Sequence, residues 1–522
     1  MIKTDIMVGL TYSGRDIKRA ICQALPVNED EIKSCEIIKK ALKLSEKNKG
    51  YALTVHIELS PEREAGLLKM RKKVKPAEDY TLTLPEYKKA LPPVIVGAGP
   101  AGLLCALTLA EAGACPIVLE RGEQVEKRAK TVSRFMSGGE LSEDTNIQFG
   151  EGGAGAFSDG KLKVGSMDKY KRKVLTSFVE AGAPEEILYT VGAHLGTDRL
   201  PKIVASVREK IISLGGKFIY KAKFCDYKEN QSSVIAFYEK DGKRQSVEAE
   251  GIILAAGHSA RDTMELLYSK GLPMEPKGFG IGARIEHKRE YINKLVYGDS
   301  AIADTVGTAS YSLVTHLKGG RSVYSFCMCP GGEVVAAASE CGGIVTNGMS
   351  EYSRMADNSN AAILVSLTPA DFGSPHPLAG FELQRRIERA AYSVSGSFAA
   401  PAIGLSDFMK RVEPKNLPLA PSYKRGVTAA ALEACLPEKI TDSMRAGISD
   451  FDDWMPGFNA EQSILTAPET RTTSPVKIIR DSLYRSPICP RLYLIGEGAG
   501  YAGGIVSAAT DGVRCAESIL LV

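Results

Sequence analysis

A strand, turn, helix and strand at residues 93–122 constrain the fold of this chain more than any other feature. The segment reads PVIVGAGPAGLLCALTLAEAGACPIVLERG, with apolar runs at 94–96 and 117–119 on either side of a predicted helix. The turn has the pattern G-x-G-x-x-G, and the second run ends on Glu120. This order of strand, glycine turn, helix, strand and acidic residue predicts a dinucleotide site and argues against an ordinary βαβ turn.

The glycine turn supplies what a bound pyrophosphate needs. Gly97 permits the tight turn, Gly99 lets the backbone approach the phosphates, and Gly102 lets the helix pack on the strand. The helix N-terminus offers free N–H groups and the positive end of its dipole, and Glu120 lies where an acid accepts from ribose hydroxyls. The residues predicted to bind the dinucleotide in this segment are Gly97, Gly99, Pro100, Ala101, Gly102, Glu120 and Arg121.

Composition excludes several classes of protein. The 522 residues have room for two or three domains, and 44% hydrophobic with 25% charged residues is an ordinary globular composition. A net charge of +4 implies no strong steering toward nucleic acid. Eleven scattered cysteines without metal-ligand spacing predict reduced thiols and no metal site. With no signal-like N-terminus and no apolar run that could span a bilayer, we expect a cytoplasmic protein.

Hydrophobic periodicity divides the chain into parts. The predicted parts are a ferredoxin-like α+β domain at 1–90, the first part of the dinucleotide domain at 91–274, a substrate domain at 275–460, and a return to the dinucleotide domain at 461–522. In the first part the order is βαββαβ, with strands at 6–10, 35–44, 51–59 and 80–84 and helices at 16–25 and 61–74. Its basic run at 69–75 is interpreted either as a solvated helix face or as a docking face for RNA or an acidic protein.

Further elements follow the fingerprint. Predicted strands at 217–220, 233–238 and 245–248 suggest an antiparallel meander before a buried strand at 251–257. Residues 259–262 resemble a capping box that begins another helix. The remaining predictions are helices at 198–214, 381–392 and 428–436, and strands at 279–285 and 334–339. The Gly-rich segment 149–161 is interpreted as a loop that wraps a ligand, or else as a surface loop.

These motifs together resemble a known family. A fingerprint, a meander, a strand ending in Ala-Ala-Gly and a late Gly-Glu-Gly turn before a helix resemble two-dinucleotide-fold flavoproteins of the glutathione-reductase type. More narrowly, GEGGAGAFSDGKL, AAGHSARDT, YSFCMCPGGEVVAAASE, ETRTTSPV and GEGAGYAGGI resemble a bacterial group known only as FAD-dependent dehydrogenases. The resemblance spans nearly the whole chain. It implies an α/β fold with a Rossmann-like FAD-binding domain and non-covalent FAD, but no substrate.

The resemblance also implies roles for residues outside the fingerprint. The fingerprint would bind the ADP half of FAD, and Glu497 would bond the ribityl chain or pyrophosphate. The helix after Gly504 would point its N-terminus at the flavin pyrimidine edge, where it stabilises negative charge on reduced flavin. The loop at 152–161 would lie beside the pyrophosphate and isoalloxazine. The further cofactor-binding residues implied are Gly152, Gly153, Ser158, Lys161, Ala256, Gly257, Gly496, Glu497, Gly503, Gly504 and Ile505.

The chain lacks two features of relatives that bind nicotinamide or reduce disulfides. No second complete G-x-G-x-x-G fingerprint follows a strand and precedes a helix, so an NAD(P)H donor would bind only transiently. Cys105 stands alone on the helix after the fingerprint, where disulfide reductases carry a cysteine pair, and it is expected to be a packed core thiol.

Four residues are candidates for the chemistry. Cys327 and Cys329 share a predicted strand face and are interpreted as a redox pair, or as two buried structural thiols. His258 is interpreted as a proton donor or substrate ligand, or as a cap beside the FAD ring. Arg471 suits an oxyanion or carboxylate clamp, or a structural ion pair with Glu469 or a neighbour.

The sequence is compatible with three functions. The first is an FAD-dependent oxidoreductase that transfers a hydride to or from an unidentified organic substrate. The second is an RNA-modifying flavoprotein that grips RNA through the basic N-terminal domain. The third is a non-enzymatic sensor in which the flavin and the thiols of Cys327 and Cys329 signal through partners. Neither the substrate nor the oligomeric state follows from the sequence.

Overall fold

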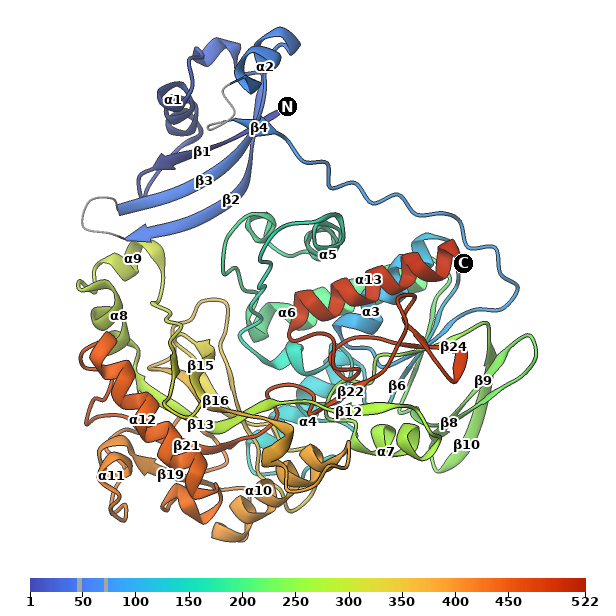
Figure 1. Cartoon of the computed structure of the whole chain (residues 1–522), viewed down its shortest axis with the longest axis vertical. Coiled ribbons are helices and arrows are strands. Elements are labelled where there is room, and N and C mark those ends of the chain that lie inside the picture. The colour runs from blue at the N-terminus through green and yellow to red at the C-terminus, as the bar shows by residue number, and fades with distance from the viewer. Residues whose placement is uncertain (45–48, 70–73) are drawn as a thin grey trace.

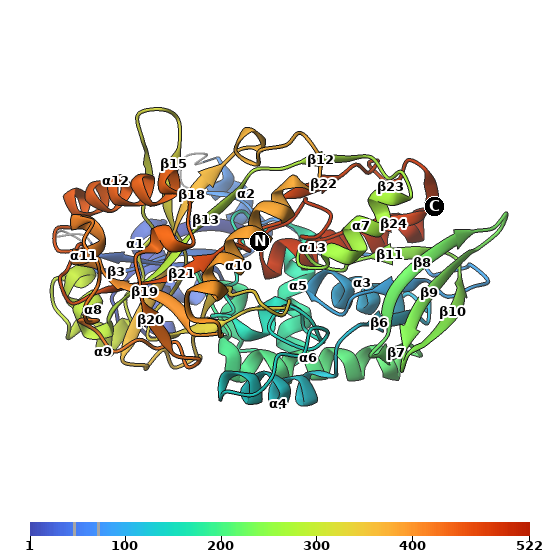
Figure 2. The same cartoon turned by 90° about the horizontal axis from the view of Figure 1, so that it is seen from below.

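A computed structural model describes residues 1–44, 49–69 and 74–522 of the chain. The chain forms three parts, which we call the N-terminal unit, the parallel-sheet unit and the seven-stranded unit (Figure 1). An extended connector runs from the N-terminal unit to the first strand of the parallel-sheet unit (Figure 1). The other two units lie side by side when seen from below (Figure 2).

The N-terminal unit contains the predicted order of elements with one extra 3₁₀ turn. Its elements are β1 (Ile2–Val8), α1 (Gly14–Ala24), η1 (Glu29–Glu31), β2 (Ser34–Leu44), β3 (Lys49–Glu58), α2 (Pro61–Leu68) and β4 (Lys75–Pro76). The strands form an antiparallel sheet in the order β2-β3-β1-β4. The side chains of Ser13 and Ser60 accept backbone N–H bonds at the starts of α1 and α2, which is where N-cap serines stabilise helices.

The strand expected at 80–84 is wrong. The sheet closes instead with Lys75–Pro76, and the alternating residues that follow belong to the connector. Leu82 and Tyr87 of this connector pack against the core of the parallel-sheet unit, so the alternation reflects burial against another part of the chain. Residues 70–73, which include most of the predicted basic run and part of the helix predicted at 61–74, lie outside the described residues.

The parallel-sheet unit is built from two stretches of the chain. Its elements are β5 (Val94–Val96), α3 (Pro100–Glu111), β6 (Ile117–Glu120), α4 (Val125–Met136), η2 (Ala154–Phe157), α5 (Lys169–Glu180), η3 (Glu185–Leu188), α6 (Gly196–Ser213), β7 (Lys217–Tyr220), β8 (Lys223–Glu229), β9 (Val234–Lys240), β10 (Lys243–Ala249), β11 (Ile252–Leu254), α7 (Arg261–Ser269), β23 (Arg485–Ser486), β24 (Cys489–Leu494) and α13 (Ile505–Leu521). A two-stranded pair, β12 (Met274–Pro276) with β22 (Val476–Ile478), joins it to the seven-stranded unit.

The main sheet of this unit has the order β23-β24-β11-β5-β6-β7. All neighbours are parallel except the short edge strand β23. The chain leaves β5 toward β6 on one side and returns through β11 on the other. Ligands of open α/β sheets bind in the crevice that such a reversal creates at the carboxyl ends of the strands.

The meander is present, but with a different first strand. β7 pairs in parallel with β6 and therefore belongs to the main sheet, whereas the three-stranded meander is β10-β9-β8. The sequence of β8, KFCDYKE, is too polar to show a strand period, and only Phe224 and Tyr227 of it are buried. The expected capping box at 259–262 is also wrong. No described side chain caps α7, because Ser259 donates its hydroxyl to Gln148 instead.

The seven-stranded unit covers the middle of the chain. Its elements are β13 (Phe279–Lys288), α8 (Arg289–Tyr297), α9 (Ile302–Val306), β14 (Val314–His316), β15 (Ser322–Cys329), β16 (Glu333–Ala336), β17 (Thr346–Met349), β18 (Asn358–Leu367), η4 (Pro369–Asp371), α10 (Ala379–Ser395), β19 (Ala400–Gly404), α11 (Leu405–Lys410), β20 (Val427–Ala429), η5 (Leu432–Ala434), α12 (Glu438–Trp454) and β21 (Ile464–Glu469). The large sheet has the order β14-β15-β18-β13-β21-β19-β20.

The helix expected at 428–436 is replaced by β20 and η5. β20 extends the sheet edge beside β19, and this pairing overrides the helix propensity of its alanines. The central strands β13 and β18 are buried on both faces, which places the core of this unit between the sheet and the helices α10 and α12. None of the helices in the described residues is long and apolar enough to span a bilayer.

Candidate functional site

A cavity of about 310 Å³ opens at the carboxyl ends of the parallel strands and extends to the seven-stranded unit. Most of the predicted site residues lie on its wall. They are Gly97, Gly99, Pro100, Ala101, Glu120, Arg121, Gly153, Ser158, Lys161, Ala256, Gly257, His258, Cys327, Arg471, Gly496, Glu497, Gly503, Gly504 and Ile505. Gly102, Gly152 and Cys329 are not among the residues that line the cavity.

The glycine turn is possible only without side chains at two positions. Gly97 has a φ of +102°, and a Cβ there would lie 2.4 Å from the carbonyl oxygen of Ala255. A Cβ on Gly102 would lie 2.0 Å from the carbonyl oxygen of Gly97, so this glycine sets the packing of α3 on the turn and faces away from the cavity. Gly99 differs, because a Cβ there would meet only Gly153 at 3.7 Å. Its backbone is open to the cavity.

Two helices begin at the cavity wall. α3 starts after Gly99 and α13 after Gly504, and no described side chain caps either N-terminus. Their first N–H groups and the positive ends of both dipoles are therefore available to a bound anion. A Cβ on Gly503 or Gly504 would meet no atom within 4 Å. The two helix ends thus form an open cradle in which negatively charged groups of a ligand would be stabilised.

Glu120 is fixed by the backbone of the turn and of the Gly-rich loop. Its carboxylate accepts N–H bonds from Ala98 at 2.8 Å, Gly122 at 2.9 Å and Gly150 at 3.1 Å. The side chain is buried, yet it lies on the cavity wall. A carboxylate offers about four lone-pair sites, so capacity remains for a ribose hydroxyl. Next to it, Arg121 pairs with Asp262 at 2.9 Å and lies over the ring of Phe149.

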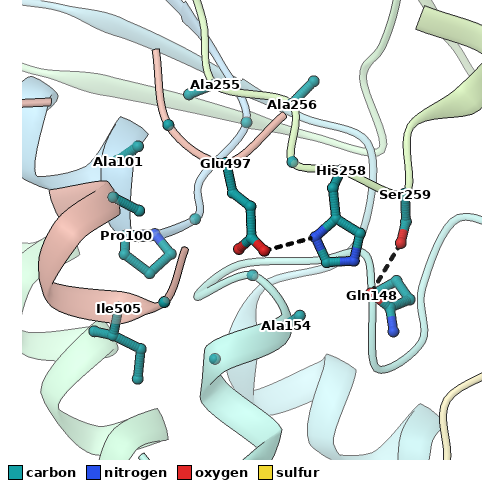
Figure 3. Close-up of a pocket in the computed structure, with 18 of the residues that line it drawn as sticks. Pro100, Ala101, Gln148, Ala154, Ala255, Ala256, His258, Ser259, Glu497 and Ile505 are labelled. Carbon is teal, nitrogen blue, oxygen red and sulfur yellow. Dashed lines mark hydrogen bonds and ion pairs between the residues drawn. The ribbon is translucent and has the colours of Figure 1, made fainter. Parts of the chain in front are cut away.

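His258 and Glu497 face one another across the cavity (Figure 3). His258 Nδ1 lies 3.4 Å from Glu497 Oε1. The other ring nitrogen, Nε2, is buried and has no hydrogen-bond partner among the described residues. A buried polar atom without a partner costs free energy unless a ligand satisfies it. His258 itself lines the cavity, so other atoms of its ring border the space that a bound molecule would fill.

The Gly-rich loop at 149–161 is an internal loop, organised by an arginine that the sequence analysis missed. Arg128 of α4 is fully buried and donates to the backbone carbonyls of residues 146, 147, 150, 151 and 153. Burial lowers the pKa of Arg128 to about 10, and five carbonyl acceptors keep its charge satisfied. Gly152 lies within this loop and packs against Ala156 and Val204, behind the cavity wall.

The end of the same loop is fixed to the seven-stranded unit. Asp159 is buried and pairs with Arg354 at 2.6 Å, and it also accepts the hydroxyl of Ser350. Lys161 donates its ammonium group to the carbonyl oxygen of Met328 in β15. These bonds hold the two units together on one side of the cavity.

The cysteines do not share a strand face as predicted, because β15 is irregular there. Its pairing with β18 skips from Phe326 to Cys329, and Cys327 has a φ of +41°. Cys327 consequently lines the cavity, whereas Cys329 is fully buried behind it. The two residues still touch, since the Cys329 thiol donates to the Cys327 carbonyl at 3.1 Å.

Arg471 lies on the cavity wall, but its guanidinium group is occupied. It donates to both oxygens of buried Glu388 at 3.1 and 3.0 Å. Arg261 donates to the same carboxylate at 2.9 and 3.1 Å. Of the two interpretations of Arg471, the structure shows an ion pair, with Glu388 as the neighbour. Glu469 pairs instead with Arg284.

Other residues of the cavity wall carried no sequence signal. They are Gln148, Lys163, Phe326, Asn347, Glu469 and Thr472. Most lie on the seven-stranded unit, far in sequence from the fingerprint, and although Phe326, Glu469 and Thr472 fall in strings that carry the family resemblance, no spacing marked them as site residues. Only their position in the folded chain reveals them.

Comparisons with known proteins agree with this geometry. The FAD binding domain family matches residues 93–140, and the family described as FAD-dependent protein, C-terminal domain-like, matches residues 278–472. An uncharacterized protein of Clostridium beijerinckii is 41% identical over 516 residues, which cover 97% of this chain and 95% of the relative.

Similarity to solved structures is weak. A flavoprotein/dehydrogenase from Cytophaga hutchinsonii has 12% sequence identity and a TM-score of 0.38, covering 82% of this chain and 76% of its own. CtdE, solved in complex with FAD, has 12% identity and a TM-score of 0.30 with coverages of 81% and 82%. TM-scores this low support no conclusion about this chain. The clostridial relative and the two matched families show that the chain belongs to a family of FAD-dependent flavoproteins and that FAD is its cofactor.

Proposed function

We propose that this protein is an FAD-dependent oxidoreductase that transfers a hydride between non-covalent FAD and a small organic substrate. One observation carries the proposal. A single cavity joins the acid Glu120 and the two uncapped helix N-termini to polar and aromatic residues of the seven-stranded unit. Such a cavity provides for a dinucleotide at one end and for a second molecule at the other.

The residues at the parallel-sheet end are those that would hold FAD. Glu120 would accept from the adenosine ribose, and the N-terminus of α3 would bind the pyrophosphate with Gly153 beside it. Glu497, held by His258, would bond the ribityl chain or pyrophosphate. The N-terminus of α13 would lie at the pyrimidine edge. The meander and the late strand, turn and helix support the glutathione-reductase type of fold for this unit.

Bound FAD supplies the acceptor and donor of the two electrons. The chain's own residues position the reactants and handle protons. The α13 N-terminus favours negative charge nearby, and this favours the reduced cofactor. The imidazole of His258, which lines the cavity and pairs with Glu497, would hold or move one proton.

The opposite end of the cavity would select the substrate. Phe326 offers an aromatic face, while Asn347 and Thr472 offer an amide and a hydroxyl group. Lys161 and Lys163 lie on the same wall, and the ammonium group of Lys163 lies 5.7 Å from the centre of the Phe326 ring. This combination favours a compact, partly apolar substrate that carries a negatively charged group.

The proposal is tested with the purified protein under anaerobic conditions. We expect a yellow protein with an oxidised-flavin spectrum, bleached by either NADH or NADPH in a stopped-flow experiment when the two are mixed separately. Because the chain has no second fingerprint, reduction should depend on donor concentration without a stable complex. A colourless protein that cannot be reconstituted with FAD would refute the proposal. A flavin that only dithionite reduces would exclude nicotinamide donors and direct a metabolite screen to other reductants.

A further inference from the structure

We propose that Cys327 and Cys329 form a redox-active pair that exchanges two electrons with the FAD through the cavity wall. The inference rests on the proposed function, since it needs FAD in the adjoining cavity. It adds a second redox centre, built from the protein's own side chains. Four observations support it, and each concerns a different part of the surroundings of these two thiols.

The first observation is the backbone at Cys327. A φ of +41° is rare for a residue with a side chain, because it strains the backbone. Such strain persists where the surrounding structure enforces it, and it concentrates at functional sites. Here the bulge turns the Cys327 side chain out of the sheet to the cavity wall, beside Phe326 and Lys161.

The second observation is the buried arginine behind the pair. Arg284 of β13 has no exposed surface, and it donates to the Cys327 carbonyl at 2.9 Å and to the Cys329 sulfur at 3.6 Å. Asn360 and Glu469 fix the guanidinium group at 3.0 and 3.1 Å. A cation held beside two thiols stabilises a thiolate, which is the reactive form of cysteine.

The third observation is the division of roles between the two thiols. The pKa of Cys327 is lowered, first by the side chain of Cys329 and then by Arg284 and Lys161. The pKa of Cys329 is raised well above its usual range by the same contact and by burial. The half-buried member, Cys327, is therefore the thiol that ionises first, and the buried member keeps its proton.

The fourth observation is a contrast within the chain. Cys105 of α3 and Cys515 of α13 also contact each other, but both are fully buried and neither lines the cavity. Burial raises the pKa of Cys515 well above its usual range. The two thiols of this second pair contact each other but have no access to the cavity, so they serve as an internal control.

The reaction balances without any further reagent. The Cys327 thiolate and the Cys329 thiol lose two electrons and form one sulfur–sulfur bond. The S–H bond of Cys329 breaks in the same conversion. Oxidised FAD accepts the two electrons together with one proton, and so becomes the singly deprotonated reduced cofactor. The reverse direction reduces the disulfide with electrons from reduced FAD. A disulfide between residues two apart closes a small strained ring, and strained disulfides are readily reduced.

The test counts electrons in the holoenzyme. The protein is oxidised with diamide, freed of reagent, and titrated anaerobically with dithionite while flavin absorbance is followed. We expect four electrons per FAD in the wild type, and two in both Cys327→Ser and Cys329→Ser. The control variant Cys341→Ser removes an exposed thiol away from the cavity and should still take four. Two electrons in the wild type would overturn the proposal.

Peptide mass spectrometry provides a readout independent of the flavin. After diamide, the peptide that contains both Cys327 and Cys329 should be two hydrogens lighter and resist alkylation, while Cys105 and Cys515 remain reduced thiols. In the untreated protein, the rate of Cys327 alkylation should rise with pH, and its midpoint should lie below the pKa of an ordinary cysteine thiol. Alkylation of both thiols after diamide would contradict the pair, even if one serine variant fails to fold. If NADH and NADPH cannot reduce the flavin but the protein still takes four electrons, the result would contradict the nicotinamide donor of the proposed function and would support the redox pair of Cys327 and Cys329.

Discussion

Glu388 neutralises two buried arginines, and its replacement by glutamine provides the sharpest test of how the site is held together. The carboxylate accepts four bonds from Arg261 and Arg471 and a fifth from Thr470 at 2.7 Å. All of these side chains are buried. The two guanidinium groups hold the pKa of Glu388 far below its usual range, so it is ionised at every working pH.

Glu388→Gln keeps the shape of the side chain but leaves Arg471 without its counter-charge and Arg261 with only the partly exposed Glu340. Breaking a buried ion pair from one side costs about 3–5 kcal/mol, because the remaining charge stays desolvated. Glu340 offers a matched control, since it also contacts Arg261, at 3.0 Å, but 30% of its side chain is exposed. Glu340→Gln should cost at most about 1 kcal/mol, as expected for a solvated pair.

Two signals allow the measurement. Trp454, the single tryptophan of the chain, lies at the end of α12 and reports unfolding of the seven-stranded unit in urea. Flavin fluorescence reports release of FAD. Because Arg471 lines the cavity, Glu388→Gln should lower both the urea midpoint and the temperature of FAD release. Equal effects of Glu388→Gln and Glu340→Gln on both signals would refute the reasoning.

Three further predictions concern the same site. Gly102→Ala places a Cβ 2.0 Å from a backbone oxygen and should lower the free energy of unfolding by about 1–3 kcal/mol, with loss of FAD in gel filtration. The control Gly66→Ala places a Cβ that meets no atom within 4 Å, and it should be neutral or mildly stabilising. His258→Ala removes the partner of Glu497 and should raise the Kd for FAD in a fluorescence titration about tenfold, as loss of one contact to a charged group implies. His316→Ala on the surface should leave the Kd unchanged, and equal affinities of the two variants would remove His258 from the binding site. Burial raises the pKa of Glu469 from 4.5 to about 7 against the opposing effect of Arg284, so its folded state binds a proton more tightly than its unfolded state. The protonated carboxyl group therefore contributes stability below pH 4.5, and this contribution is lost as the pH rises toward 7. The unfolding free energy of Glu469→Gln should consequently fall less than that of the wild type between pH 5 and pH 8. Because Cys327 is present in both proteins, parallel curves of unfolding free energy against pH would contradict the assignment to Glu469.

Local sequence pattern was sufficient to predict the dinucleotide fingerprint, but it was insufficient to predict the residues that surround it in the folded chain. The turn at Gly97 and Gly102 was predictable because its requirement, the absence of a Cβ, is visible in a few consecutive residues. The family resemblance extended this to Glu497. The partner of Arg471 was not predictable, because Glu388 lies 83 residues away and only folding brings them together.

Irregular backbone was the other source of error. A two-residue period predicts that Cys327 and Cys329 share a face, but one bulge in β15 reverses that result. Likewise, the alternation at 80–84 records burial of Leu82 against another unit, which hydrophobic periodicity cannot distinguish from a strand. Arg128 was missed because an arginine on an amphipathic helix is normally solvated, and nothing local shows that five carbonyls surround it.

The cradle made by α3 and α13 has a consequence for how the protein acquires its cofactor in a cell. One half of the cradle is synthesised with Gly99 and the other only with Gly504. At about 5–20 residues per second, a ribosome needs roughly 20–80 s to make the chain between them. Throughout that time the early helix can pack against neither α13 nor the late strand β24. FAD can therefore complete the site only after nearly the whole chain has left the ribosome, and cofactor supply acts on the finished chain instead of guiding its early folding.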